Sequence, residues 1–193
     1  MKTKMKRSLL VILMLGTLIG YANENNTSNT LDARKVKVEF KAVKKGQTLT
    51  INDKDGTQIF NQEIKNSGDY SRFFDLTALN NGVYTAELNK DFEILIKTFK
   101  VENQKVTFLS SETKKIFKPV IRNEKDLVLI SKMNFNNEPL KVIIYYENEV
   151  ILSETIKGGH ILKRVYKLSE TEKGNYKVVI NTDNRMYIKD FTI

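Results

Sequence analysis

The stretch Asp75-Leu76-Thr77-Ala78-Leu79-Asn80-Asn81-Gly82-Val83-Tyr84 decides the fold, because a related stretch occurs again later in the chain. The second copy, 92 residues further on, is Lys167-Leu168-Ser169-Glu170-Thr171-Glu172-Lys173-Gly174-Asn175-Tyr176. In both copies a polar turn ends in a glycine, and a tyrosine follows that glycine by two positions at the start of an alternating strand. This order predicts a tight corner that leads into a strand whose tyrosine ring is anchored in the core.

The offset of 92 residues holds without a gap from Tyr70–Val101 onto Leu162–Ile193. Nine of the 32 aligned pairs are identical, whereas chance would give roughly two, so we infer an internal duplication of one structural unit. The identical pairs are Arg72/Arg164, Leu76/Leu168, Gly82/Gly174, Tyr84/Tyr176, Asn89/Asn181, Asp91/Asp183, Ile96/Ile188, Lys97/Lys189 and Phe99/Phe191.

The chain has 193 residues, of which 40% are hydrophobic, and this is enough to build a core in each of two units. We expect one β-sandwich repeat at residues 35–102. The second repeat is expected at residues 103–193, with the connecting strands included in it.

Met1–Ala22 has the pattern of a secretory signal peptide. Four basic residues precede the apolar run Leu9–Ile19, and Gly20-Tyr21-Ala22 supplies small residues where a signal peptidase cleaves. A membrane anchor is the alternative, but the apolar run is short for a bilayer span. Residues 23–34 are rich in Asn, Thr and Ser, and they predict a flexible mature N-terminus.

The chain contains no cysteine, which excludes a disulfide framework, a thiolate zinc site and a lipoprotein anchor. Export without disulfides is typical of a bacterial envelope protein. The net charge of +9 falls to +5 when the four basic residues of the signal are removed, and the remaining lysines do not cluster with aromatic residues. We therefore expect no nucleic-acid partner and no membrane span after signal cleavage, with the protein in the periplasm, on the cell surface or outside the cell.

Short alternating segments separated by turn residues follow from residue 35 to the end of the chain. Val36, Val38 and Phe40 share one face of the first segment, and Asp53-Lys54-Asp55-Gly56 is a hairpin signal. The apolar pattern of Phe92–Val101 changes phase near Leu95-Ile96, which predicts a bulge or a twist. Helical periodicity is absent outside the signal, so the fold class is all-β, with two tandem antiparallel β-sandwiches.

The pattern Leu-x-x-Leu-x-x-Gly-x-Tyr after an Asp-Gly hairpin resembles immunoglobulin-like and fibronectin type III-like modules. More narrowly, Val36–Val101 is similar to the C-terminal sorting domain of type IX secretion cargo in Bacteroidetes-type bacteria. The second unit resembles this domain more loosely. The motifs that carry the similarity are Asp55-Gly56, Asp75-Leu76, Leu79, Gly82-Val83-Tyr84 and Ile96-Lys97. The resemblance implies a sandwich with a hairpin, a Gly-x-Tyr strand and a basic final strand, and a role in transport.

Candidate catalytic and metal-binding residues do not form a recognisable constellation. His160, the only histidine, could act as a general base, but its Gly158-Gly159 lead-in is typical of an exposed turn. Asn52–Gly56 suggests a calcium loop, but Ile51 and Gln62 stand where an EF-hand needs ligands. The carboxylate pairs Asp53/Asp55 and Glu170/Glu172 lie in or beside turns. We expect no catalytic, cofactor-binding or metal-binding residues.

Four tyrosines could form a sugar-binding platform, although the alternative places them in the core. They are Tyr145, Tyr146, Tyr166 and Tyr187. We favour a non-catalytic exported protein that acts by binding, or by structural contact with a protein or cell-surface partner in the cell envelope. The alternative is a cargo or accessory of type IX secretion whose C-terminal sandwich serves as a sorting domain. An enzyme with an unrecognised site is the third possibility.

Overall fold

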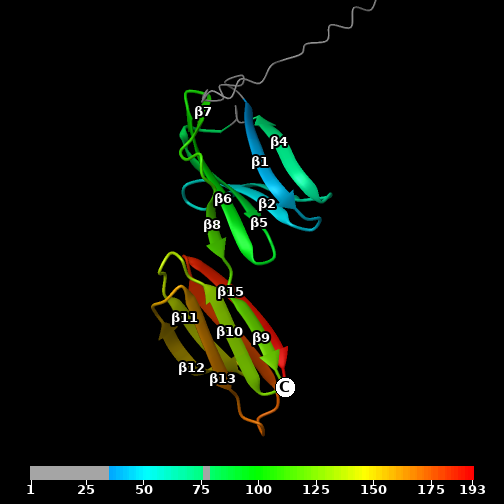
Figure 1. The fold of residues 1–193 in the computed structure, drawn as a ribbon, viewed down its shortest axis with the longest axis vertical. Coiled ribbons are helices and arrows are strands. Elements are labelled where there is room, and N and C mark those ends of the chain that lie inside the picture. The colour runs from blue at the N-terminus through cyan, green and yellow to red at the C-terminus, as the bar shows by residue number, and fades with distance from the viewer. Residues whose placement is uncertain (1–34, 76–78) are drawn as a thin grey trace, which may run out of the picture. The chain divides into compact units, whose positions relative to one another are not determined.

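A computed structural model describes residues 35–75 and 79–193 of the chain. These residues form fifteen strands and no helix, which confirms the all-β prediction (Figure 1). The predicted signal peptide and flexible N-terminus lie outside the described residues, as do the corner residues 76–78. All strands belong to one compact unit that spans residues 31–193, so the predicted division at residues 102 and 103 stays a prediction.

The first eight strands precede residue 118, and the other seven follow it. The first eight are β1 (Lys35–Val43), β2 (Thr48–Asn52), β3 (Gln58–Glu63), β4 (Gly68–Asp75), β5 (Gly82–Asn89), β6 (Glu93–Glu102), β7 (Lys105–Phe108) and β8 (Lys114–Phe117). The others are β9 (Val120–Glu124), β10 (Leu127–Met133), β11 (Leu140–Tyr146), β12 (Glu149–Ile156), β13 (Ile161–Lys167), β14 (Asn175–Thr182) and β15 (Arg185–Thr192).

The strands pair into four antiparallel sheets. Strands β1 and β4 form a small sheet that lies against the larger sheet β3-β2-β5-β6-β7, and β8 adds to the larger sheet along β6. We call these eight strands the first sandwich. Strands β13-β10-β9 lie against the sheet β12-β11-β14-β15, and we call these seven strands the second sandwich. Figure 1 shows the two pairs of sheets.

Each sandwich has its own hydrophobic core, because alternate side chains of its strands face inward. The first core contains the predicted inward face Val36, Val38 and Phe40, whose side chains are at most 4% exposed. The second core is built from strands β10 to β14 in the same way, and Tyr176 is its largest fully buried side chain.

The strand pairing repeats with the predicted offset. The pairs β1–β4, β2–β3, β2–β5 and β5–β6 recur as β10–β13, β11–β12, β11–β14 and β14–β15. The register agrees for the first and last of these pairs of strands, since Val36 lies opposite Phe74 and Val128 lies opposite Tyr166. Strand β11 is shifted by one residue, since Thr48 lies opposite Asn89 whereas Lys141 lies opposite Asn181. The repeat therefore extends to β1 and β10, where sequence identity alone did not reveal it.

The predicted bulge in the last strand of the first repeat is wrong. Strands β5 and β6 pair in continuous register from Gly82 opposite Val101 to Asn89 opposite Ile94. Ile94 and neighbouring apolar residues are buried on both faces of β6 because β8 pairs with its edge, and Ile116 of β8 joins them in a small separate cluster. The change of phase in the sequence reflects this second covered face.

Candidate interaction surface

The repeated corner places the two tyrosines in matching surroundings. The hydroxyl of Tyr84 donates a hydrogen bond to the backbone carbonyl of Asn80 at 2.9 Å, and that of Tyr176 donates to Glu172 at 2.8 Å. Each ring stacks on an equivalent phenylalanine, Phe99 or Phe191, with ring centroids 5.7 Å apart. Burial raises the pKa of the Tyr176 phenol. The anchored ring predicted from the sequence is confirmed, and its role is structural.

The two corner glycines differ in backbone conformation and in the space available for a side chain. Gly174 has φ +155°, and a Cβ atom there would lie 2.4 Å from a carboxylate oxygen of Glu147. That oxygen accepts a hydrogen bond from the backbone N–H of Asn175 at 2.7 Å. Gly82 does not have a positive φ, and a Cβ atom there would make only ordinary contact with the Tyr84 ring at 3.6 Å. The tight corner thus requires glycine in the second copy alone.

His160 is exposed in the β12–β13 loop, and its ring lies 5.9 Å from that of Phe135. Its backbone carbonyl accepts a hydrogen bond from Asn134 at 2.7 Å. Among the described residues no carboxylate forms an ion pair with its imidazole, so nothing there orients the ring as a general base. The contacts of His160 are those of a turn residue.

The loop Asn52–Gly56 is a hairpin turn. One carboxylate oxygen of Asp53 accepts hydrogen bonds from the backbone N–H groups of Asp55 at 2.9 Å and Thr57 at 2.8 Å, and Gly56 has φ +83°. The carboxylate therefore holds the turn. Over residues 35–75 and 79–193, no group of three or more His, Cys, Asp or Glu residues could hold a metal ion.

The candidate carboxylates of the second corner have structural partners. Glu170 forms an ion pair with Lys167 at 2.8 Å, and the backbone carbonyl of Glu172 holds the tyrosine of the corner. Both side chains are exposed. Their contacts are those of a surface turn, whereas a glycosidase pair lies across a cleft.

The four candidate tyrosines do not form a platform. The hydroxyl of Tyr166 donates to Glu154 at 2.8 Å, Tyr187 packs on the second core, and Tyr146 donates to the Lys173 carbonyl at 3.1 Å. Tyr145 alone lines an open hollow of about 440 Å³. The prediction that these rings belong to the core therefore holds for Tyr146, Tyr166 and Tyr187.

One margin of each sandwich is fastened by an arginine that joins the two sheets. Arg72 of β4 donates to the Gln62 side chain of β3, and Arg164 of β13 donates to Glu154 of β12 at 2.9 Å. The two donors are an identical pair of the repeat, and the acceptors are also 92 residues apart. These contacts link edge strands that would otherwise be free to separate.

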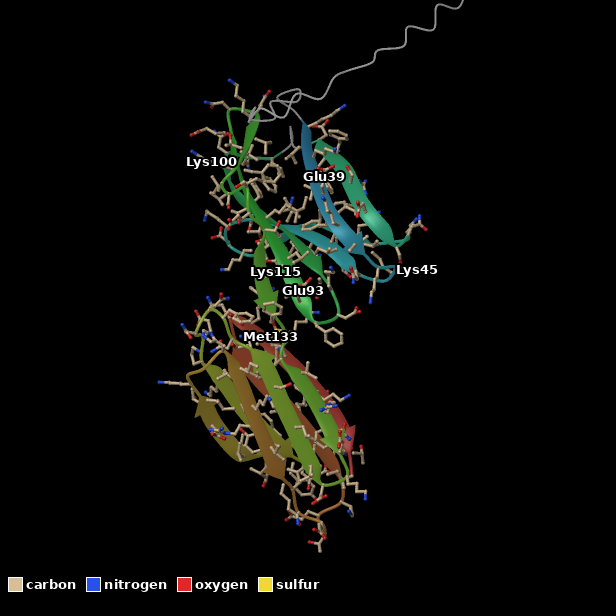
Figure 2. The ribbon with its side chains drawn as sticks, viewed as in Figure 1. Glu39, Lys45, Glu93, Lys100, Lys115 and Met133 are labelled. Carbon is tan, nitrogen blue, oxygen red and sulfur yellow. The ribbon has the colours of Figure 1, made fainter. Side chains whose placement is uncertain are left out.

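The opposite margin differs between the two sandwiches. In the first, β6 is covered by β7 and β8, and Lys115 of β8 lies 3.7 Å from Glu93 of β6 (Figure 2). In the second, β15 pairs with β14, and no other described strand pairs with it. We call residues 185–192 the terminal edge. Met186 and Ile188 of the terminal edge are 63% and 55% exposed, which makes this edge the strongest candidate for an interaction surface.

No helix in the described parts of the chain has the length and apolar character that a membrane crossing requires.

Comparison with curated proteins gives no match. Among solved structures, the BSP domain of a biofilm associated protein is 13% identical with a TM-score of 0.28, covering 84% of this chain and 27% of that one. The human OSCAR ligand-binding domain is 10% identical with a TM-score of 0.24, covering 83% of this chain and 90% of that one. Extracellular domains 3-5 of Drosophila OTK are 8% identical with a TM-score of 0.23, covering 82% of this chain and 92% of that one.

The comparison with protein families gives a match that lies on the first sandwich. Residues 32–102 match the family described as "Secretion system C-terminal sorting domain". The resemblance that the sequence shows over Val36–Val101 is thereby confirmed, and strands β1 to β6 of this chain match the sorting domains of secretion cargo.

Proposed function

We propose that the protein is an exported, non-catalytic cargo of the type IX secretion system, built of two β-sandwich domains that correspond to the first and the second sandwich. In this proposal the first sandwich is read by the transport machinery. The second contacts a protein or cell-surface partner in the envelope. The observation that carries the proposal is the family match at residues 32–102.

A secretion assay with the whole mature chain tests this role. A periplasmic reporter is fused ahead of residues 23–193 and expressed with a signal peptide in a bacterium that has this secretion system. Replacing Asp75–Asn81 by the sequence of Lys167–Lys173 alters the sorting-type corner but keeps the glycine and tyrosine that follow it. We expect the reporter to reach the cell surface with the natural corner and to remain in the periplasm with the replaced one.

The second candidate is that the C-terminal sandwich serves as the sorting domain. It is favoured by the matching hydrogen bonds of Tyr84 and Tyr176, because the second copy holds its tyrosine in the same way as the first. The reciprocal replacement, Lys167–Lys173 by the sequence of Asp75–Asn81, decides between the two candidates. Periplasmic retention by this replacement alone would assign sorting to the second sandwich and overturn our assignment to the first.

The separation of the candidate catalytic groups supports a non-catalytic role. His160 lies in the β12–β13 loop, whereas Asp53 and Asp55 are engaged in the β2–β3 turn. Catalysis by acid and base groups requires them to meet at one substrate. A broad hydrolase screen on the mature chain should be negative, and an activity that the His160→Ala substitution abolished would contradict the proposal.

A further inference from the structure

We propose that the terminal edge of β15 binds an added antiparallel strand from another protein. The occupant is an extended acidic segment with a branched apolar residue opposite Met186. The inference rests on the proposed binding role of the second sandwich and names the surface and the kind of partner. Its evidence is the covered edge of β6, which is the counterpart of β15 in the first sandwich.

The backbone of β15 has the hydrogen-bonding groups that an added strand needs. Gly174 and Ile193 exchange both backbone hydrogen bonds, so Tyr187, Lys189 and Phe191 also bond to β14 in the antiparallel ladder. The intervening residues direct their N–H and C=O groups away from β14. Ile188 and Asp190 are two of these, and within the described chain no strand pairs with them on that side.

The same outward groups are used in the first sandwich. The carbonyl of Thr98 on β6 accepts a hydrogen bond from the N–H of Leu109 at 2.9 Å. Its counterpart 92 residues later is Asp190. The carbonyl of Phe92, just ahead of β6, accepts from Lys118 at 2.9 Å, which shows that this edge is satisfied near both ends of the strand. The terminal edge therefore repeats a backbone arrangement that β6 already uses for pairing.

The side chains of the terminal edge show the same difference. Ile94 and Ile96 of β6 are 5% and 8% exposed because they cluster with Ile116 of β8. Their counterparts on β15 are Met186 and Ile188, which are mostly exposed. Covering apolar surface stabilises an association because it removes that surface from water. A branched apolar residue in the position that Ile116 occupies opposite β6 would cover the side chains of Met186 and Ile188.

The charges indicate an acidic occupant. On β6, Glu93 pairs with Lys115 of the covering strand at 3.7 Å. The counterpart of Glu93 is Arg185, which has the opposite charge, and Lys189 on the same edge has no ion pair with any described residue. Arg185 already donates a hydrogen bond to Glu87 at 2.7 Å, but a guanidinium has five N–H donors and can donate to a second carboxylate as well. The one acidic residue of the edge, Asp190, lies 4.0 Å from Lys177 of β14, so a second copy of β15 would bring more basic than acidic charge to the edge, which disfavours it as the occupant.

Peptides made on the pattern of β8 test the proposal on the whole mature chain. The parent peptide is Ser-Glu-Thr-Lys-Lys-Ile-Phe-Lys, the sequence of residues 111–118, and the acidic peptide has Glu at the two positions of Lys114 and Lys115. We expect the acidic peptide to protect the amides of Ile188 and Asp190 from hydrogen exchange. It should bind about tenfold more tightly than the parent, because opposite charges meet at the edge. No protection at millimolar peptide would overturn the proposal.

Two substitutions and a control locate the binding. Asp190→Pro removes an N–H that points away from β14, so it should abolish binding without loss of a ladder bond. Ile188→Asp should weaken binding through the side chain, because it removes an apolar contact and repels the acidic peptide, and this guards against misfolding of the proline variant. Val165→Asp, on the exposed face of β13, should bind normally. Binding that survives Asp190→Pro and Ile188→Asp would refute the site.

Two further readouts separate the alternatives. Concentration-dependent dimers that Asp190→Pro dissolves would assign the edge to a second copy and overturn the acidic partner. The Asp190→Pro chain should still carry the reporter to the cell surface, since the corner Asp75–Asn81 is unchanged. Failure of the corner replacement to affect secretion would refute the proposed sorting role and leave the peptide result standing.

Discussion

Lys132 and Asp183 form a buried ion pair in the second sandwich, with 2.9 Å between Nζ and Oδ2 and side chains only 2% and 5% exposed. The counterpart of Lys132 in the first sandwich is Phe40, a core residue that is 3% exposed. The second copy thus has a charge pair where the first has an aromatic ring. Asn134, which is fully buried, stands near the lysine and donates to the carbonyl of Gly159 at 3.4 Å.

Removing one partner of this pair should destabilise the second sandwich strongly. Lys132→Met leaves the Asp183 carboxylate buried without its cation, and we expect a loss of about 3–5 kcal/mol in the free energy of unfolding. The double substitution Lys132→Met with Asp183→Asn should recover part of this loss, because no uncompensated charge remains. Urea denaturation of the single and double variants measures the difference. Lys41→Met, at an exposed position of β1, is the control.

The two corner tyrosines should contribute alike. Tyr84→Phe and Tyr176→Phe each remove one hydroxyl-to-carbonyl hydrogen bond and keep the stacked ring, so each should cost about 1 kcal/mol. The exchange rates of the amides in β5 and β14 report the two sandwiches separately. A cost for one substitution and none for the other would contradict the view that the two tyrosines are held in the same way.

The two corner glycines should respond differently to alanine. Gly174→Ala forces the Glu147 carboxylate away from the N–H of Asn175, and it puts an alanine in a region of φ that favours glycine. We expect a loss of about 1–3 kcal/mol, typical of a strained backbone position. Gly82→Ala meets only ordinary contacts and should change the stability by less than about 0.5 kcal/mol. Thermal unfolding of the two variants provides the comparison.

The parts of the fold that could be predicted are those that short-range pattern controls. Alternation located the strands, and the repeated Gly-x-Tyr located the anchored rings at Tyr84 and Tyr176, because a corner depends on residues close in sequence. The cover that β8 provides for β6 was not predicted, since no local signal states which strand a short segment joins. The apolar run around Ile94 results from that contact, and the prediction of a bulge there is wrong.

The candidate surface was predicted less well than the fold. In the sequence, Met186 and Ile188 do not differ from ordinary strand residues. Their exposure is explained by the position of β15 at the edge of its sheet. The ion pair of Lys132 and Asp183 could not be foreseen either, because Lys132 lies on β10 whereas Asp183 lies in the turn between β14 and β15, two strands of another sheet. A lysine inside an alternating apolar pattern was the one available signal.

The link between Glu154 and its two donors predicts a pH dependence on the acid side. The hydroxyl of Tyr166 and the guanidinium of Arg164 hold the pKa of the Glu154 carboxyl below its ordinary value. A lowered pKa means that the stabilisation is present above the unfolded pKa of about 4.5 and is lost as the pH falls through the folded value. We expect the Glu154→Gln variant to lose less stability than the natural chain between about pH 5 and pH 3.

The first sandwich supplies the matched variant, because Gln62 occupies the position of Glu154 beside Arg72. Gln62→Glu should therefore introduce an acid-side dependence into the first sandwich, where none is expected from this position in the natural chain. Urea denaturation at about pH 3.5 and pH 7, with amide exchange in β3 and β12 as local probes, measures both effects. An acid-side loss of equal size in the natural chain and in Glu154→Gln would show that other carboxylates control the transition. The contact between Arg164 and Glu154 would then fasten the margin of the sandwich without contributing to its stability.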